Sequence, residues 1–161
     1  LLHRLGTKKG HILSFHFQEH HRTTRKNNFE DTIYQKGKIL PNPADKEIRA
    51  LFCLGIPHCF LLPFAPGFVL GTLIGAVRYY YCHRKSHLDI EWCKTKLPWH
   101  YEHHMAPNQH ANWGVSTDFF DRLFGTRERY IGTDRQSKLV GYRKPRVKQQ
   151  LGQNTAAVQS G

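Results

Sequence analysis

Residues 83–104 read HRKSHLDIEWCKTKLPWHYEHH and hold five histidines in two groups. His83 and His87 are four residues apart, and the HYEHH group that starts at His100 repeats histidine three and four positions later. Residues three or four apart lie on one face of a helix, so each group can direct its imidazoles toward one point. Imidazole is the commonest metal ligand among side chains. The spacing therefore predicts helices that carry a metal site.

A third group lies upstream. The segment HFQEHH at residues 16–21 contains three more histidines, and eleven of the twelve histidines fall within residues 1–21 and 83–110. Eight clustered imidazoles exceed the four ligands that a structural zinc ion takes, so we interpret them as ligands of two metal ions. The candidate ligands in these groups are His16, His20, His21, His83, His87, His100, His103 and His104.

An apolar segment separates the histidine-rich blocks. Residues 50–77 contain no Asp, Glu, Lys or Arg, which is long enough for one membrane crossing of about 20 residues. Three prolines between residues 57 and 66 divide the segment, however, and proline kinks or ends a helix.

Topology then favours a hairpin. Two histidine blocks that bind one metal centre must lie on the same side of a membrane, and two full crossings would need about 40 residues. Residues 48–81 are therefore expected to form a hairpin that enters the membrane and returns, with its second arm continuing to His83 and His87. A hairpin buried inside a soluble helical protein is the alternative.

These features predict an all-α protein: a membrane-embedded helical bundle with a cytosolic, histidine-rich helical cap. The chain begins at Leu1 with LLHR, which is typical of the end of an apolar helix, so we expect a fragment that lacks upstream membrane helices. Residues 1–135 would form the metal-binding domain. Residues 136–161 are polar and are expected to form a disordered tail.

The charge and the cysteine content limit which classes of function the sequence allows. The formal charge is +12, and the basic residues are spread along the chain without a zinc-finger, basic-zipper or RNA-recognition signature, so no nucleic-acid partner is expected. Lys and Arg that flank an apolar segment are instead typical of cytoplasmic loops of membrane proteins. None of the four cysteines forms a C-x-x-C pair, which favours a reduced, cytoplasm-facing site.

The metal follows from the expected substrate. All-nitrogen sites suit zinc, copper, iron or nickel. An apolar hairpin beside the site indicates a lipid substrate, whose unactivated C–H bonds require oxidation by a redox-active metal. Zinc has no redox chemistry. Iron is therefore the predicted metal.

The ordered segments HFQEHH, HRKSH, HYEHH and ANWGVSTDFFDRLFGT together resemble the sterol desaturase/fatty acid hydroxylase superfamily. This resemblance implies a membrane-bound enzyme with two iron ions that uses O₂ to hydroxylate or desaturate a lipid such as a fatty acyl chain or sterol. It implies metal ligation by the histidines given above and adds His3, which begins the first box. It also implies an integral membrane location, in the endoplasmic reticulum of a eukaryote or the inner membrane of a bacterium, with the site facing the cytoplasm.

Two departures from the family pattern leave alternatives open. The middle box usually reads H-x-x-H-H, whereas His16 stands four residues before His20. In the first box Thr7 and Lys8 occupy the positions expected for a second histidine, so either His11 substitutes or the ligand set is reduced. A catalytically silent metal-binding homologue with a scaffold role is therefore the alternative function. A zinc hydrolase or metal transporter is disfavoured because the chain has no H-E-x-x-H motif.

Other residues are expected to support the site. Ligating histidines usually donate their second ring N–H to a carboxylate or carbonyl. The candidate carboxylates are Glu19, Asp31, Glu102 and Asp121. Of these, Asp121 is preferred as the anchor of the DRLFGT turn, and Asn112 and Gly114 are expected to shape the loop that closes the site.

The reducing electrons must come from another protein, because no flavin, haem or nucleotide motif is present. A cytochrome-b-type haem protein, or a ferredoxin with its reductase, would suit the basic stretches Arg22–Lys38 and Arg78–Lys96. Opposite potentials accelerate the encounter of such partners.

Overall fold

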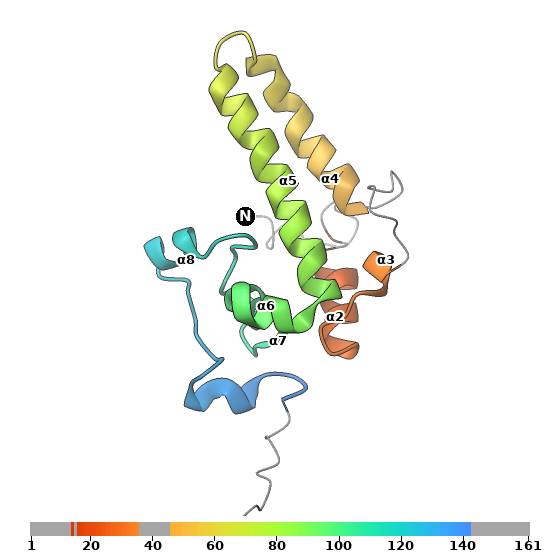
Figure 1. The fold of residues 1–161 in the computed structure, drawn as a ribbon, viewed down its shortest axis with the longest axis vertical. Helices are drawn as coiled ribbons and strands as arrows, with labels where there is room; N and C mark the ends of the chain where they lie inside the picture. The colour runs from red at the N-terminus through yellow and green to blue at the C-terminus, as the bar shows by residue number, and fades with distance from the viewer. Residues whose placement is uncertain (1–13, 15, 36–45, 143–161) are drawn as a thin grey trace, which may run out of the picture.

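A computed structural model of the chain describes residues 14, 16–35 and 46–142. Every regular element in these ranges is helical, which confirms the predicted all-α class (Figure 1). The elements are η1 (His16–His21), α2 (Arg22–Lys26), α3 (Thr32–Gln35), α4 (Lys46–Gly55), η2 (Ile56–Leu61), α5 (Pro66–Leu88), α6 (Ile90–Lys96), α7 (Pro98–Met105), α8 (Phe119–Leu123) and η3 (Asp134–Lys138).

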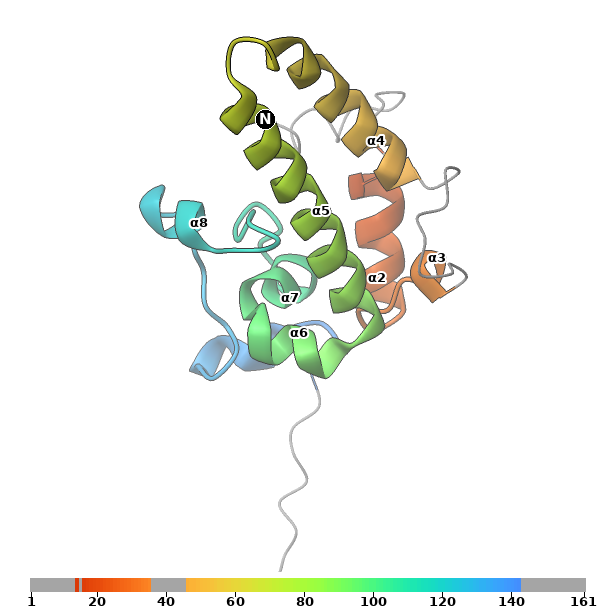
Figure 2. The ribbon, with the colours of Figure 1, turned by 45° about the horizontal axis from the view of Figure 1, so that its top comes forward.

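A helical hairpin extends from one side of the molecule. Its first arm is α4, which continues as the 3₁₀-helix η2, and its second arm is the antiparallel helix α5 (Figures 1 and 2). Pro66 is the first residue of α5, a position where the missing N–H costs nothing and the fixed φ favours the helix. The last turns of α5 continue beyond the apolar segment and carry His83 and His87, as expected.

The length and apolar character of the helices bear on whether the hairpin enters a membrane. Across residues 14, 16–35 and 46–142, no helix combines the length and the apolar character that a bilayer crossing requires. The charge-free part of α5 ends at Val77, one residue before Arg78. Membrane insertion of the hairpin therefore stays a prediction.

Helices α6 and α7 pack beneath the hairpin and complete a small core. The chain turns at Asp89, whose side chain caps α6 by accepting a hydrogen bond of 3.0 Å from the backbone N–H of Trp92. It turns again at Leu97, after which Pro98 begins α7. The buried core cluster comprises Phe29, Cys82, Cys93, Leu97, Tyr101, Met105, Ala106, Tyr130 and Leu139.

The folded body continues beyond the predicted boundary at residue 135. Leu139 is buried in the core cluster, and the backbone N–H of Val140 donates to the carbonyl of Met105 at 2.9 Å. The prediction was wrong for residues 136–142 because a polar composition hid one buried leucine. The rest of the predicted tail, residues 143–161, lies outside the described residues.

Candidate metal centre

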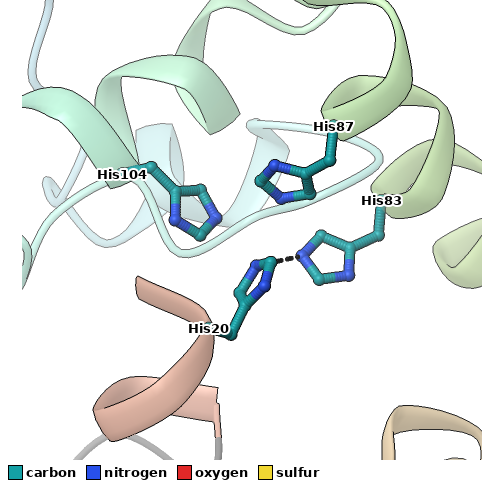
Figure 3. A group of neighbouring side chains, drawn as sticks. All are labelled: His20, His83, His87 and His104. Atoms are coloured by element: carbon teal, nitrogen blue, oxygen red, sulfur yellow. Dashed lines mark hydrogen bonds between the residues drawn. The ribbon is translucent and has the colours of Figure 1, made fainter. Parts of the chain in front are cut away.

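Four buried histidines from three separate elements converge at the base of the hairpin (Figure 3). They are His20 from η1, His83 and His87 from α5, and His104 from α7. One ring nitrogen of each lies within 4.8 Å of those of the other three. Four imidazoles that converge from distant parts of the sequence form a nitrogen-rich site of the kind that transition metals occupy.

A second group adjoins the first. His16, His21 and His103 also offer ring nitrogens within 4.8 Å of one another. The ring centroids of His21 and His104 are 4.2 Å apart, so the two groups share a border. The sequence thus folds into neighbouring sites of four and three histidines, each with enough ligands for one metal ion.

The winding of η1 explains how this one segment supplies histidines to both groups. Residues His16–His21 form a π-helix, in which hydrogen bonds join residues five apart. In an α-helix a residue five positions on would lie roughly 140° around the axis. The π-helix instead keeps His16 beside both His20 and His21, with ring centroids 5.2 and 5.1 Å apart.

His100 belongs to the same cluster but to neither group. It is buried, and its ring centroid lies 4.8 Å from that of His104 and 5.0 Å from that of His83. Neither of its ring nitrogens has a hydrogen-bond partner. His100 therefore adds two buried ring nitrogens without a partner beside the four-histidine group.

Two carboxylates orient ligands of the four-histidine group. Asp31 Oδ2 lies 2.6 Å from Nδ1 of His20, and Glu47 Oε1 is hydrogen-bonded to Nδ1 of His83. The hydroxyl of Tyr34 donates to Glu47 Oε2 at 2.6 Å. Carboxylate–histidine pairs of this kind fix the ring orientation and make the opposite nitrogen a better ligand.

The other ligands are oriented by neutral acceptors. Nδ1 of His87 lies 2.8 Å from the carbonyl oxygen of Phe29, and Nδ1 of His103 lies 2.7 Å from that of Ala111. Nδ1 of His104 lies 3.2 Å from Thr24 Oγ1. The backbone of Phe29 has a φ of 82°, which is strained for an aromatic residue and brings its carbonyl to His87.

These contacts leave a set of inward-facing lone pairs that a bound cation would satisfy. Because Asp31 and Glu47 accept hydrogen bonds, the protons of His20 and His83 reside on Nδ1. Their Nε2 atoms, 3.1 Å apart, then face each other as two acceptors. The buried Nε2 atoms of His87 and His104 have no hydrogen-bond partner. Buried polar atoms without a partner are rare in native proteins, and a bound ion is one way to satisfy them, so the residues fit a metal centre.

The protonation state also suits metal binding. Burial, reinforced by the charges of neighbouring histidines, holds the pKa values of His20, His87, His100 and His104 well below the ordinary value of 6.5. Burial lowers the pKa of His103 to about 4. Although burial opposes ionisation of Glu47, the charge and hydrogen bond of His83 outweigh it and lower the pKa of that carboxyl. Neutral imidazoles beside ionised carboxylates are the ligating forms.

The acidic residues considered in the sequence have different roles. Asp31 orients His20, whereas the exposed Glu19 pairs with Lys46 at 2.5 Å. Buried Glu102 faces away from the histidines and pairs with Arg127 at 2.7 Å. Sequence analysis missed Glu47, the acid at the first turn of the hairpin, because it is distant in sequence from every histidine group.

The loop after α7 is held by the residues expected to shape it. Asp121 accepts hydrogen bonds from the backbone N–H groups of Trp113 and Gly114 at 2.8 and 2.7 Å. A Cβ on Gly114 would lie 1.9 Å from the carbonyl oxygen of Thr117, so only glycine fits there. Asn112 has a φ of 57°, and its side chain bonds to the backbone of residue 128 through both its oxygen and its nitrogen.

Three histidines of the two histidine-rich blocks remain, and the structure describes one of them. His3, the expected start of the first box, and the possible substitute His11 lie outside the described residues. His110 is exposed and lies beside Trp113, with ring centroids 6.2 Å apart.

No family model matches the chain, and neither a curated protein nor a solved structure matches it.

Proposed function

We propose that the protein is a membrane-associated non-haem di-iron oxidoreductase that uses O₂ to hydroxylate or desaturate a lipid chain. The observation that carries the proposal is the pair of adjoining histidine groups, one of four and one of three, in each of which the ligand nitrogens lie within 4.8 Å of one another. When bound, the two iron ions would supply the activation of O₂ that an unreactive C–H bond requires.

The chain's own residues would hold and tune these ions. His20, His83, His87 and His104 would bind one ion, and His16, His21 and His103 the other. Asp31 and Glu47 would place two negative charges just outside the ligands, where they offset part of the metals' positive charge.

The two histidine groups differ in their number of ligands, which suggests that the two metal ions would have different roles. An iron ion held by three protein ligands would have more coordination positions left for an exogenous ligand than one held by four. The three-histidine group would therefore be the position at which O₂ and substrate meet the centre.

The hairpin supports a lipid substrate. Among the described residues, thirteen large apolar side chains between Phe52 and Tyr81 are exposed, with Phe64 at 85% and Phe60 at 78%. Apolar patches of this extent are uncommon on soluble monomers and mark membrane or protein contacts. From Pro66 to Val77, α5 would reach about 18 Å into a hydrocarbon core about 30 Å thick.

The same helices build the hairpin and the metal centre. Glu47 lies in the first turn of α4, and His83 and His87 lie in the last turns of α5. A lipid chain beside the hairpin would thus lead toward the histidines at its base. This continuity is the reason to assign the oxidation to a membrane lipid rather than to a soluble compound.

An external donor would deliver the electrons. We propose an acidic cytochrome-b-type haem protein, or a ferredoxin with its reductase, because exposed cations such as Arg22, Lys26 and Arg78 lie on the elements that surround the centre. The centre would face the cytoplasm, at the endoplasmic reticulum or bacterial inner membrane.

Metal analysis and lipid mass spectrometry test the proposal together. Cells that produce the protein should contain a lipid with one added oxygen atom or one added double bond, and the purified protein should bind two iron ions. The double variant His103→Ala/His104→Ala should lose both signals. His110→Ala, which removes an exposed histidine outside the cluster, is the matched control and should retain both.

Two results would favour a different function. Two bound iron ions without lipid-dependent O₂ consumption would favour the silent homologue. Bound zinc with hydrolytic activity would favour a zinc hydrolase, although Glu102 is turned away from the histidines and cannot act there as a base.

A further inference from the structure

Helix α7 separates the metal centre from a cavity on its opposite side. Its histidines face the cluster, whereas Glu102, two residues after His100 and therefore roughly opposite on the helix, borders a cavity of about 260 Å³. The cavity is also lined by Lys94 of α6 and Arg122 of α8. No element of the proposed oxidation uses it.

The cavity carries an excess of positive charge. Its lining includes the cations Lys94, Arg122, Arg127 and Arg129 and the carboxylates Glu102 and Asp118, which gives a formal balance of +2 (four minus two).

Both carboxylates are already engaged. Glu102 accepts hydrogen bonds from Arg127 and, through its other oxygen, from the backbone N–H groups of Tyr130 and Ile131, at 2.7 to 2.8 Å. Asp118 accepts from Nε of Arg122 at 2.8 Å and Nε of Arg127 at 3.3 Å.

The remaining cations are available to a ligand. Within the described part of the chain, Arg129 forms no hydrogen bond or ion pair, and it is exposed at the cavity. Lys94 forms a surface pair with Glu91 at 2.8 Å, and such pairs contribute little; its Nζ also lies 5.2 Å from the centroid of the Tyr101 ring. An arginine and a lysine that share one small cavity form a site suited to the charge and geometry of a phosphate group.

Two neighbours of the cavity indicate where the phosphate comes from. Trp99 and Ile131 give it an apolar wall, and its size suits a headgroup rather than a protein segment. Arg122 belongs to α8, which projects from the body (Figure 1) and exposes four large apolar side chains: Phe119, Phe120, Leu123 and Phe124. Apolar side chains beside cations are the arrangement that binds an anionic membrane surface.

We propose that this cavity binds the phosphate of an anionic phospholipid, while the apolar side chains of α8 enter the adjoining lipid. The lipid source rests on the membrane association proposed above, whereas the affinity for phosphate is independent of the metal centre. The loop that leads into α8 contacts the hairpin, because Arg78 donates to the carbonyl of Ser116 at 3.5 Å.

Calorimetry with short-chain phosphatidic acid and with inorganic phosphate, on the iron-loaded full chain, tests the anion site. Short-chain phosphatidic acid should bind saturably with one molecule per chain, and Arg129→Gln should weaken this binding about tenfold. Lys138→Gln removes one positive charge at an exposed position of η3 outside the cavity and should change the affinity less than twofold. Equal effects of both variants, or no saturable binding, would overturn the proposal.

Vesicle sedimentation distinguishes the two sources of phosphate. Phosphatidylcholine vesicles that contain phosphatidic acid should bind the chain more strongly than pure phosphatidylcholine vesicles, and Phe120→Ser/Phe124→Ser should remove this difference but not the binding of inorganic phosphate. Inorganic phosphate that binds as tightly as the short-chain lipid would overturn the lipid assignment. Unchanged iron content in Arg129→Gln keeps this test separate from that of the metal centre.

Discussion

The Nε2 atoms of His20 and His83 lie 3.1 Å apart, although the two residues are 63 positions apart in the sequence. Each ring is turned inward by a carboxylate on its other nitrogen, Asp31 for His20 and Glu47 for His83. The acidic partners therefore determine which nitrogen faces the centre, and their removal should loosen the metal without removing a ligand.

Asp31→Asn and Glu47→Gln should each lower metal affinity 10- to 100-fold, because the amide keeps the volume of the side chain but not its charge. Competition with a chelator of known affinity measures the change. Glu19→Gln, at the exposed acid that pairs with Lys46, is the control and should have no effect. Equal affinities for all three variants would contradict the assigned roles.

Acid should destabilise the metal-free protein in a defined pH range. Burial lowers the pKa of His103 to about 4, while the unfolded chain takes up its proton near pH 6.5. The unfolded state therefore binds more protons below pH 6.5, and stability falls as the pH decreases toward 4. Each buried histidine contributes a loss of up to about 1.4 kcal/mol per pH unit. Urea unfolding between pH 7.5 and 4.5 measures this slope, and a flat profile would refute it.

Gly114→Ala should destabilise the fold by about 2 kcal/mol or more, because its Cβ would meet the carbonyl of Thr117 at 1.9 Å. Gly75→Ala is the matched control. Nothing lies within 4 Å of a Cβ there, and alanine favours the helix by about 0.5–1 kcal/mol. Thermal unfolding should therefore shift in opposite directions for the two variants, and a shift in the same direction would contradict the close approach at Gly114.

A charge in the hairpin should weaken membrane binding if the hairpin is inserted. Val77→Glu introduces a carboxylate at a side chain that is 71% exposed, where lipid would surround it. Vesicle flotation should show less bound protein. Ile33→Glu changes an apolar residue outside the hairpin that is 57% exposed and serves as the control. The same loss in both variants would indicate general charge repulsion instead.

Electron delivery should depend on salt. An acidic donor that docks on the basic elements around the centre should be attracted less strongly in salt. Raising the ionic strength from about 0.01 to about 0.15 M should therefore slow the reduction of the centre by this donor several-fold. Lys85→Glu should mimic this effect at low salt, and Lys138→Glu, outside both basic stretches, should not. A rate that is independent of salt would exclude electrostatic docking.

The histidine spacing predicted much of the site because helical periodicity relates sequence distance to direction. His83 and His87, four apart on α5, share a face in the structure as they do in the sequence. The proline-divided apolar segment likewise predicted the hairpin. Both inferences needed only local geometry, which the sequence encodes directly.

Contacts between distant segments could not be read in this way. Glu47 and Tyr34 reach His83 only because α3 and the start of α4 fold back against α5, and no local pattern records that approach. Leu139 was missed for the same reason, since its burial depends on Tyr101 and Met105 from α7 rather than on its polar neighbours.

The π-helical turn of η1 affects which spacings between histidines can still bring their rings together. The H-x-x-H-H spacing expected from the resemblance suits an α-helix, and one more residue between His16 and His20 would turn His21 away if the α-winding persisted. Here the wider turn accommodates that residue, and all three rings stay together. The backbone of η1 thus keeps together three rings that the same spacing would separate on an α-helix.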